Sequence, residues 1–143
     1  MSVRTTTVWI GQMAFAAEVN GHKLVMDVDP EWGGADQGPR PKPLLLAALS
    51  GCSGMDVVPL LAKMRVEQYK LRIIVEADST SEHPVIYRDI RMDFHFSGEN
   101  LPSDKLLKAV NLSTERYCGV GAMLKKAADI TVRVFNNDQE VKP

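Results

Sequence analysis

Two cysteines, Cys52 and Cys118, are the residues of this sequence best suited to covalent chemistry. Cys52 lies between two glycines in the segment LSGCSGMD, and Cys118 lies in RYCGVGAM, where one predicted helix ends and another begins. A thiolate at either place could act as a nucleophile, be oxidised, or form a disulfide with the other cysteine. Because helix N-termini favour the thiolate, the position of Cys118 before a helix predicts a lowered pKa for its thiol.

The residues around Cys52 predict a raised pKa for its thiol, opposite to the prediction for Cys118. Asp56 follows one helical turn later, and its negative charge would raise the pKa of the Cys52 thiol. Activation of Cys52 would therefore require a cation, and Arg40 and Lys42 in the preceding segment are the candidates. For both cysteines the alternative is a structural role as a small buried side chain, which is common for free cysteine.

No other chemical motif competes with the cysteines. His22, His83 and His95 show no metal-ligand spacing, so we expect neither a metal nor another cofactor. The sequence contains no phosphate-binding loop, nucleophile elbow or dinucleotide fingerprint. The pair Lys125-Lys126 is too short to indicate nucleic acid, and the net charge of -1 gives no general attraction to nucleic acid or to an anionic membrane.

The first half of the chain contains the elements that must position Cys52. Short strands are predicted for residues 1–28, with Asn20-Gly21 as a hairpin signal, and residues 29–43 form a loop rich in proline and glycine. Residues 44–64 have the length and composition of a helix, and their apolar side chains fall on nearly all faces. Such a helix must be buried on every side, and in a chain of 143 residues a second subunit is the simplest cover.

The second half predicts two long strands and then helices. Alternating apolar residues over 68–97 are typical of two half-buried antiparallel strands joined by a polar turn. Helices, with Ser103 as a candidate N-cap, and a final strand fill residues 103–136.

The composition, 45% hydrophobic and 24% charged, excludes a disordered chain, and we expect one α+β domain over residues 1–143. Since neither a signal peptide nor a stretch approaching a membrane span is recognised, we expect a cytoplasmic protein.

Three segments together resemble the OsmC/Ohr family of osmotically induced and organic hydroperoxide resistance-like proteins. They are PKPLLLAALSGCSGMDVVPLLAKMR, LSTERYCGVGAMLKKAADITVRV and the loop DPEWGGADQGPRP. The resemblance covers nearly the whole chain, including both cysteines in their helical contexts. It implies an OsmC-like α+β fold in which antiparallel sheets wrap around buried central helices in an intertwined homodimer, with a thiol site at each end of the dimer interface.

The same resemblance implies a function. Cys52 corresponds by position to the peroxide-attacking thiol and Cys118 to the resolving thiol of a peroxidase that acts on organic hydroperoxides in oxidative stress defence. An external dithiol, often lipoyl-like in this family, would reduce the resulting disulfide. Two thiols so far apart in sequence can react in this way only if folding brings their Cα atoms within about 7 Å of each other.

The sequence departs from the family at one place. The family's peroxidases carry a glutamate, paired with a loop arginine, where this chain has Lys42-Pro43. Arg40 is the candidate arginine, and Lys42 could stabilise a thiolate by its own charge. Candidates for the replacement carboxylate are Glu31, Asp36 and Glu115. Two alternatives stay open: a non-peroxidatic dimer that binds or senses a small hydrophobic molecule, and another thiol-dependent reaction on a hydrophobic electrophile.

Overall fold

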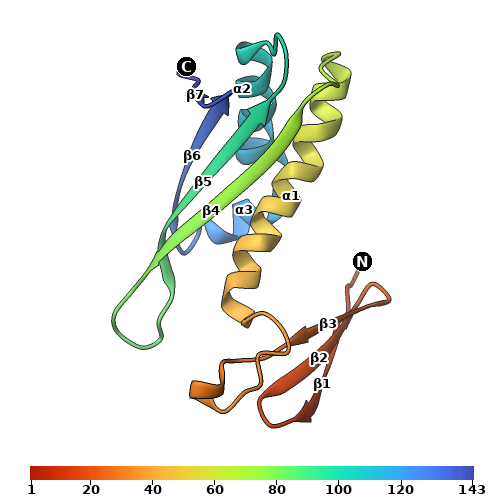
Figure 1. Cartoon of the computed structure of the whole chain (residues 1–143), viewed down its shortest axis with the longest axis vertical. Helices are drawn as coiled ribbons and strands as arrows, with labels where there is room; N and C mark the ends of the chain where they lie inside the picture. Colours follow the sequence, from red (N-terminus) through yellow and green to blue (C-terminus); the bar gives the residue numbers. More distant parts are fainter. The chain divides into compact units, whose positions relative to one another are not determined.

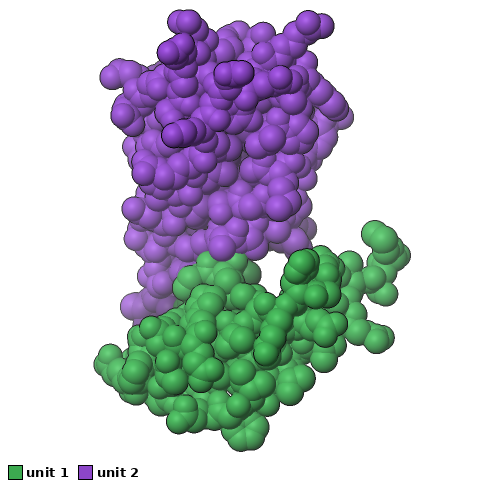
Figure 2. Space-filling model, turned by 45° about the vertical axis from the view of Figure 1, so that its right-hand side comes forward, with its two compact units in different colours: residues 1–45 green, residues 46–143 purple.

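The chain forms two compact units, Met1–Leu45 and Leu46–Pro143, which Figure 2 distinguishes by colour. The structure is a computed structural model that describes all residues, 1–143. Each unit contains its own β-sheet, and helices accompany the sheet of the second unit (Figure 1). The predicted α+β class is therefore confirmed.

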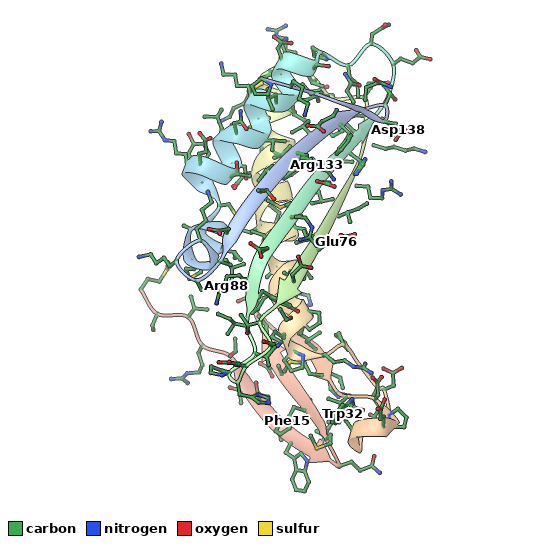
Figure 3. The ribbon with its side chains drawn as sticks, turned by 90° about the vertical axis from the view of Figure 1, so that its left-hand side faces the viewer. Phe15, Trp32, Glu76, Arg88, Arg133 and Asp138 are labelled. Atoms are coloured by element: carbon green, nitrogen blue, oxygen red, sulfur yellow. The ribbon has the colours of Figure 1, made fainter.

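The first unit is built on a three-stranded antiparallel sheet. Its strands are β1 (Thr6–Gly11), β2 (Ala14–Val19) and β3 (His22–Met26). Asn20 and Gly21 both adopt positive φ in the turn between β2 and β3, which is the backbone conformation that an Asn-Gly hairpin requires. The side chains of Phe15 and Trp32, labelled in Figure 3, are exposed at 41% and 69%.

The predicted loop after β3 is ordered around one carboxylate. Asp27 is only 2% exposed, and its side chain accepts hydrogen bonds from the backbone N–H groups of Gln37, Val28 and Ala35. These bonds, the one from Gln37 first, hold the pKa of Asp27 below its usual range. A single 3-10 turn, η1 (Pro30–Trp32), lies inside this loop.

The long helix α1 (Pro41–Lys63) begins at Pro41 rather than at residue 44. Proline fits the first turn of a helix, where the backbone N–H groups have no partner in any case. One face of α1 is buried through Leu49, Ser53, Val57 and Leu61. The opposite face stays exposed along a stripe of apolar or small residues: Ala48, Gly51, Met55, Val58 and Ala62. One chain alone therefore does not bury this helix on all sides.

By length and composition, α1 could also cross a membrane. Its most apolar window has a mean hydropathy of 1.8. The expectation that no stretch of the sequence approaches a membrane span is thus wrong for this helix. Core helices of soluble proteins meet the same criterion.

The second unit is built on a four-stranded sheet whose strands lie in sequence order. They are β4 (Lys70–Ser79), β5 (Tyr87–Ser97), β6 (Asp129–Asn136) and β7 (Gln139–Glu140). β4 and β5 pair antiparallel, as the alternation predicts, whereas β6 runs parallel to β5. A parallel neighbour requires a crossover connection, and the helices between β5 and β6 provide it. Figure 3 looks onto the sheet with α1 behind it, and Glu76 and Arg133 are labelled on its strands.

Three short helical segments make that crossover. They are α2 (Ser103–Leu112), the π-helical turn η2 (Ser113–Tyr117) and α3 (Gly119–Leu124). Ser103 does not cap α2, because the N-cap position is Pro102 and the Ser103 hydroxyl instead accepts a hydrogen bond from Asn136 at 2.8 Å. The core of the unit is formed by side chains of α1, the inner face of β5 and α2, with Phe94, Phe96 and Leu106 almost fully buried.

Candidate functional site

Cys52 lies near the middle of α1, at the border between its buried and exposed faces. Its neighbours along the helix, Leu49 and Ser53, are buried, and Gly51 is exposed. The Cys52 side chain is partly exposed and packs against the hydrophobic core of the second unit. It therefore combines access from solvent with an apolar surrounding.

Cys118 lies at the junction between η2 and α3 and is 5% exposed. As the N-cap residue of α3, it accepts a hydrogen bond from the Gly121 N–H through its sulfur, at 3.3 Å. Its own backbone N–H donates to the Ser113 carbonyl at 2.8 Å. π-helical turns such as η2 occur frequently at functional sites, and this one determines where Cys118 is held.

Folding brings the two thiols near each other without joining them. Both cysteines are free, and they lie close enough for Cys52 to act on the protonation of Cys118, but not at disulfide distance. Burial raises the pKa of the Cys118 thiol, and the interaction with Cys52 and the Asp56 charge raise it further. The bond from Gly121 lowers this pKa but does not outweigh burial. The lowered pKa predicted for Cys118 from its place before a helix is thus wrong.

A chain of hydrogen bonds, buried at its two serines, connects α1 to η2. The Ser113 hydroxyl lies 2.9 Å from an Asp56 carboxylate oxygen and 2.9 Å from the Ser53 hydroxyl. Because an ionised carboxylate only accepts, Ser113 donates to Asp56, and the Ser53 hydroxyl can then donate to Ser113. Both serines are 0% exposed. Sequence reasoning noted Asp56 alone, since no local pattern joins residues so distant along the chain.

The residues proposed to activate Cys52 belong to the first unit. The Arg40 guanidinium forms ion pairs with Asp29 and Asp36 and also donates to the Gly38 carbonyl. Of the three candidate carboxylates, Asp36 is the one paired with Arg40, and Asp29 was not identified from the sequence. The roles of Arg40 and Asp36 toward Cys52 stay predictions.

The other predicted residues lie elsewhere. Glu31 is part of η1, and Lys42 lies in the first turn of α1. Glu115, in η2, lines an open groove of about 850 Å³ beside α2 and the C-terminal residues, together with Lys108 and Lys142. No group of three or more His, Cys, Asp or Glu side chains is arranged to hold a metal ion.

A second open groove, of about 680 Å³, lies along α1 and β4. Its lining is mostly apolar or small: Ser50, Gly51, Gly54, Met55, Val58, Pro59, Leu71 and Ile73. Gly51, the residue before Cys52 in α1, lines this groove, whereas neither cysteine does.

Comparison with known proteins places these features in context. The family model described as OsmC-like protein matches residues 33–133, a range that includes both cysteines. Protein YhfA of Escherichia coli K12 is 33% identical over 124 residues, which cover 86% of this chain and 90% of YhfA. A hypothetical protein from Aquifex aeolicus has the same fold with a TM-score of 0.84 and 26% identity, covering 95% of this chain and 96% of that one.

A more distant structure shares the fold alone. It is an organic hydroperoxide resistance protein OsmC from Legionella pneumophila, with a TM-score of 0.67 and 14% identity. The match covers 94% of this chain and 97% of that one.

Proposed function

Because this chain belongs to the OsmC-like protein family, we propose that it is a thiol-dependent peroxidase that reduces organic hydroperoxides through Cys52 and Cys118. One observation carries the proposal: the two thiols are free and near enough for Cys52 to raise the pKa of Cys118, with Cys118 buried and Cys52 partly exposed. The partly exposed Cys52 thiol is accessible to a substrate, and the buried Cys118 thiol lies near it. The Legionella relative, described as an organic hydroperoxide resistance protein, supports the substrate class.

In the first step, the Cys52 thiolate attacks one peroxide oxygen. A sulfur–oxygen bond forms while the oxygen–oxygen bond breaks, so the sulfur loses two electrons and the peroxide gains them. The leaving alkoxide takes up a proton and departs as an alcohol, and Cys52 becomes a sulfenic acid. The apolar groove along α1 and β4 suits the alkyl group of an organic hydroperoxide better than it suits hydrogen peroxide.

In the second step, Cys118 condenses with the sulfenic acid. A sulfur–sulfur bond forms, and the sulfenic oxygen leaves as water together with the Cys118 proton. A dithiol then reduces the disulfide by exchange and is itself oxidised to a disulfide, which returns both cysteines to thiols. The two thiols interact before the reaction but are not at disulfide distance, so the two sulfurs must move together for the disulfide to form.

The proposal includes Arg40 as the cation that activates Cys52. Asp29 and Asp36 hold the Arg40 guanidinium, and Asp36 takes the place of the glutamate that the family's peroxidases carry near Lys42. A guanidinium has five N–H donors in a planar fork, so it can bind carboxylates and still face an anion. Arg40→Lys should therefore retain the charge but lower peroxide turnover.

The proposed active form is a homodimer. The exposed stripe of α1, formed by Ala48, Gly51, Met55, Val58 and Ala62, is apolar or small throughout, and a second copy of α1 can cover it. Small residues such as Gly51 and Ala48 allow close approach of two helices. A cover over this stripe would also cover the groove along α1 and β4, since Gly51, Met55 and Val58 belong to both.

The experiment that tests the function is peroxide consumption with a dithiol reductant. The wild type is expected to consume cumene hydroperoxide. Turnover should fall at least ~1000-fold in Cys52→Ser, and in Cys118→Ser it should stop after one oxidation event. Mass spectrometry should detect the Cys52–Cys118 disulfide in the wild type only. Equal rates for the wild type and Cys52→Ser would rule out the peroxidase proposal.

The apolar groove along α1 and β4 supports a second candidate, a protein that binds a small hydrophobic molecule. That function predicts a hydrophobic ligand retained by the purified protein. It also predicts no peroxide turnover and equal ligand affinity in the wild type and in Cys52→Ser. The two measurements, made on the same preparation, therefore separate the candidates.

A further inference from the structure

The hydrogen-bonded chain of Ser53, Ser113 and Asp56 takes no part in the proposed reduction of the peroxide by Cys52 and Cys118. Its two serines are completely buried, and its last member is a carboxylate. Ser113 has a second role, because its carbonyl accepts the backbone N–H of Cys118 at 2.8 Å. Asp56 is thus anchored to the residue that also fixes the backbone of Cys118.

Packing alone does not explain this series of hydrogen bonds. Apolar side chains of similar size would join α1 to η2 without removing hydroxyl and carboxylate groups from water. The chain instead places a negative charge at a defined position, four residues after Cys52 on α1 and beside the turn that holds Cys118. A fixed charge at that position acts on the protonation of the neighbouring Cys118 thiol.

The charge of Asp56 favours the protonated form of Cys118, because a second negative charge nearby is unfavourable. Cys52, also on α1, acts on Cys118 in the same direction. The cations on the neighbouring segments are engaged with other groups: Lys125 donates to the Thr114 carbonyl, and Arg116 lies over the Tyr117 ring.

We propose that Asp56 is a positioning residue of the thiol pair: held by Ser113, it keeps Cys118 beside Cys52 and keeps the proton on Cys118. This inference rests on the proposed peroxidase function and assigns an order to its two thiols. In this order Cys52 attacks the peroxide as the thiolate, while Cys118 stays protonated beside it. Once Cys52 is a neutral sulfenic acid, one of the two negative charges that hold the Cys118 proton is gone, and Cys118 can react.

The test isolates Cys118 in a Cys52→Ser background. The thiolate of Cys118 is titrated by its ultraviolet absorbance, with and without Asp56→Asn. Asparagine keeps an oxygen that accepts the Ser113 hydroxyl but removes the charge. We expect the thiolate fraction at a fixed, mildly alkaline pH to rise ~3-fold to ~10-fold in Asp56→Asn. The control is Glu67→Gln, which removes an exposed carboxylate, and it should leave the titration unchanged.

A second readout uses the chain with both cysteines. Brief treatment with a small alkylating reagent, followed by peptide mass spectrometry, should label mainly Cys52 in the wild type. The share of label on Cys118 should rise in Asp56→Asn. A loss of stability alone would not change this ratio at a pH where both proteins are folded.

An unchanged Cys118 titration in folded Asp56→Asn overturns the proposal. Should that variant fail to fold, Ser113→Ala in the same background replaces it, since it keeps the carboxylate but removes the hydroxyl that holds it. The thiolate fraction should then rise by a smaller factor, and no rise also overturns the proposal.

Failure of the proposed function gives a different pattern of results. If the peroxidase proposal is wrong, the wild type consumes no peroxide, yet the Asp56→Asn titration still shifts. If only the role of Asp56 is wrong, the wild type consumes peroxide and the titration does not shift.

Discussion

Cys118 keeps its proton mainly because it is buried, and its interaction with Cys52 and the charge of Asp56 act in the same direction. The N–H of Gly121 favours the thiolate, but one backbone bond does not replace the water lost on burial. The thiol next to a helix N-terminus therefore has a raised pKa, not a lowered one. The more exposed Cys52 is left to meet a substrate.

This protonation predicts how stability depends on alkaline pH. The folded-state pKa of Cys118 is raised above its value in the unfolded chain. Its contribution to stability is therefore fully present below the unfolded pKa and is lost as pH rises through the folded pKa. Under reducing conditions, the free energy of unfolding should fall above about pH 8.5, by at most ~1.4 kcal/mol per pH unit from this group.

Urea unfolding at a series of pH values measures this dependence. Cys118→Ala should reduce the alkaline slope, whatever its effect on stability at neutral pH. Identical slopes for the wild type and Cys118→Ala would contradict a raised pKa for this thiol.

At the scale of elements, the loop between β3 and α1 depends on Asp27. Its depressed pKa contributes stability that is present above the ordinary aspartate pKa of about 3.9 and lost as pH falls through the folded value. The first unit should therefore loosen below about pH 4, and with it the segment that carries Arg40. Asp27→Asn should make this loop several-fold more sensitive to proteolysis at neutral pH, because an amide cannot accept all three backbone N–H groups.

Limited proteolysis with mass spectrometry of the fragments locates the cleavage. Glu18→Gln, which removes an exposed carboxylate on β2, is the matched control and should be cleaved at the wild-type rate. If cleavage in Asp27→Asn falls outside the loop, Asp27 does not organise it.

The sequence predicts these elements where a local pattern defines them. The alternation of apolar and polar residues predicts β4 and β5, and Asn20-Gly21 predicts the turn between β2 and β3. The parallel pairing of β6 with β5 leaves no local signal, because it depends on the path of the crossover. The same holds within the candidate site: both cysteines stand out by type, whereas the contact of Ser113 with Asp56 exists only after folding.

At the scale of the whole molecule, α1 presents two different faces. The buried face packs into the core through Leu49, Val57 and Leu61, and the opposite face exposes Met55 at 79% and Val58 at 49%. Covering one such side chain contributes about 1.5–3 kcal/mol. A Cβ added at Gly51 would meet nothing within 4 Å in the single chain, so this chain alone gives no packing reason for a glycine there. Close approach of a second α1 would give that reason.

The proposed dimer predicts that lysine substitutions at two exposed methionines differ in their effect on the oligomeric state. Met55→Lys should shift the protein from dimer to monomer, because a lysine on the α1 stripe would be buried without a partner in the dimer. Met123→Lys is the matched control: Met123 is also exposed, at 66%, but it lies on α3 and not on the stripe. Sedimentation velocity across a range of concentrations measures both. A wild type that sediments as a monomer at every concentration, or a Met55→Lys variant that remains fully dimeric, would show that α1 is not the dimer contact.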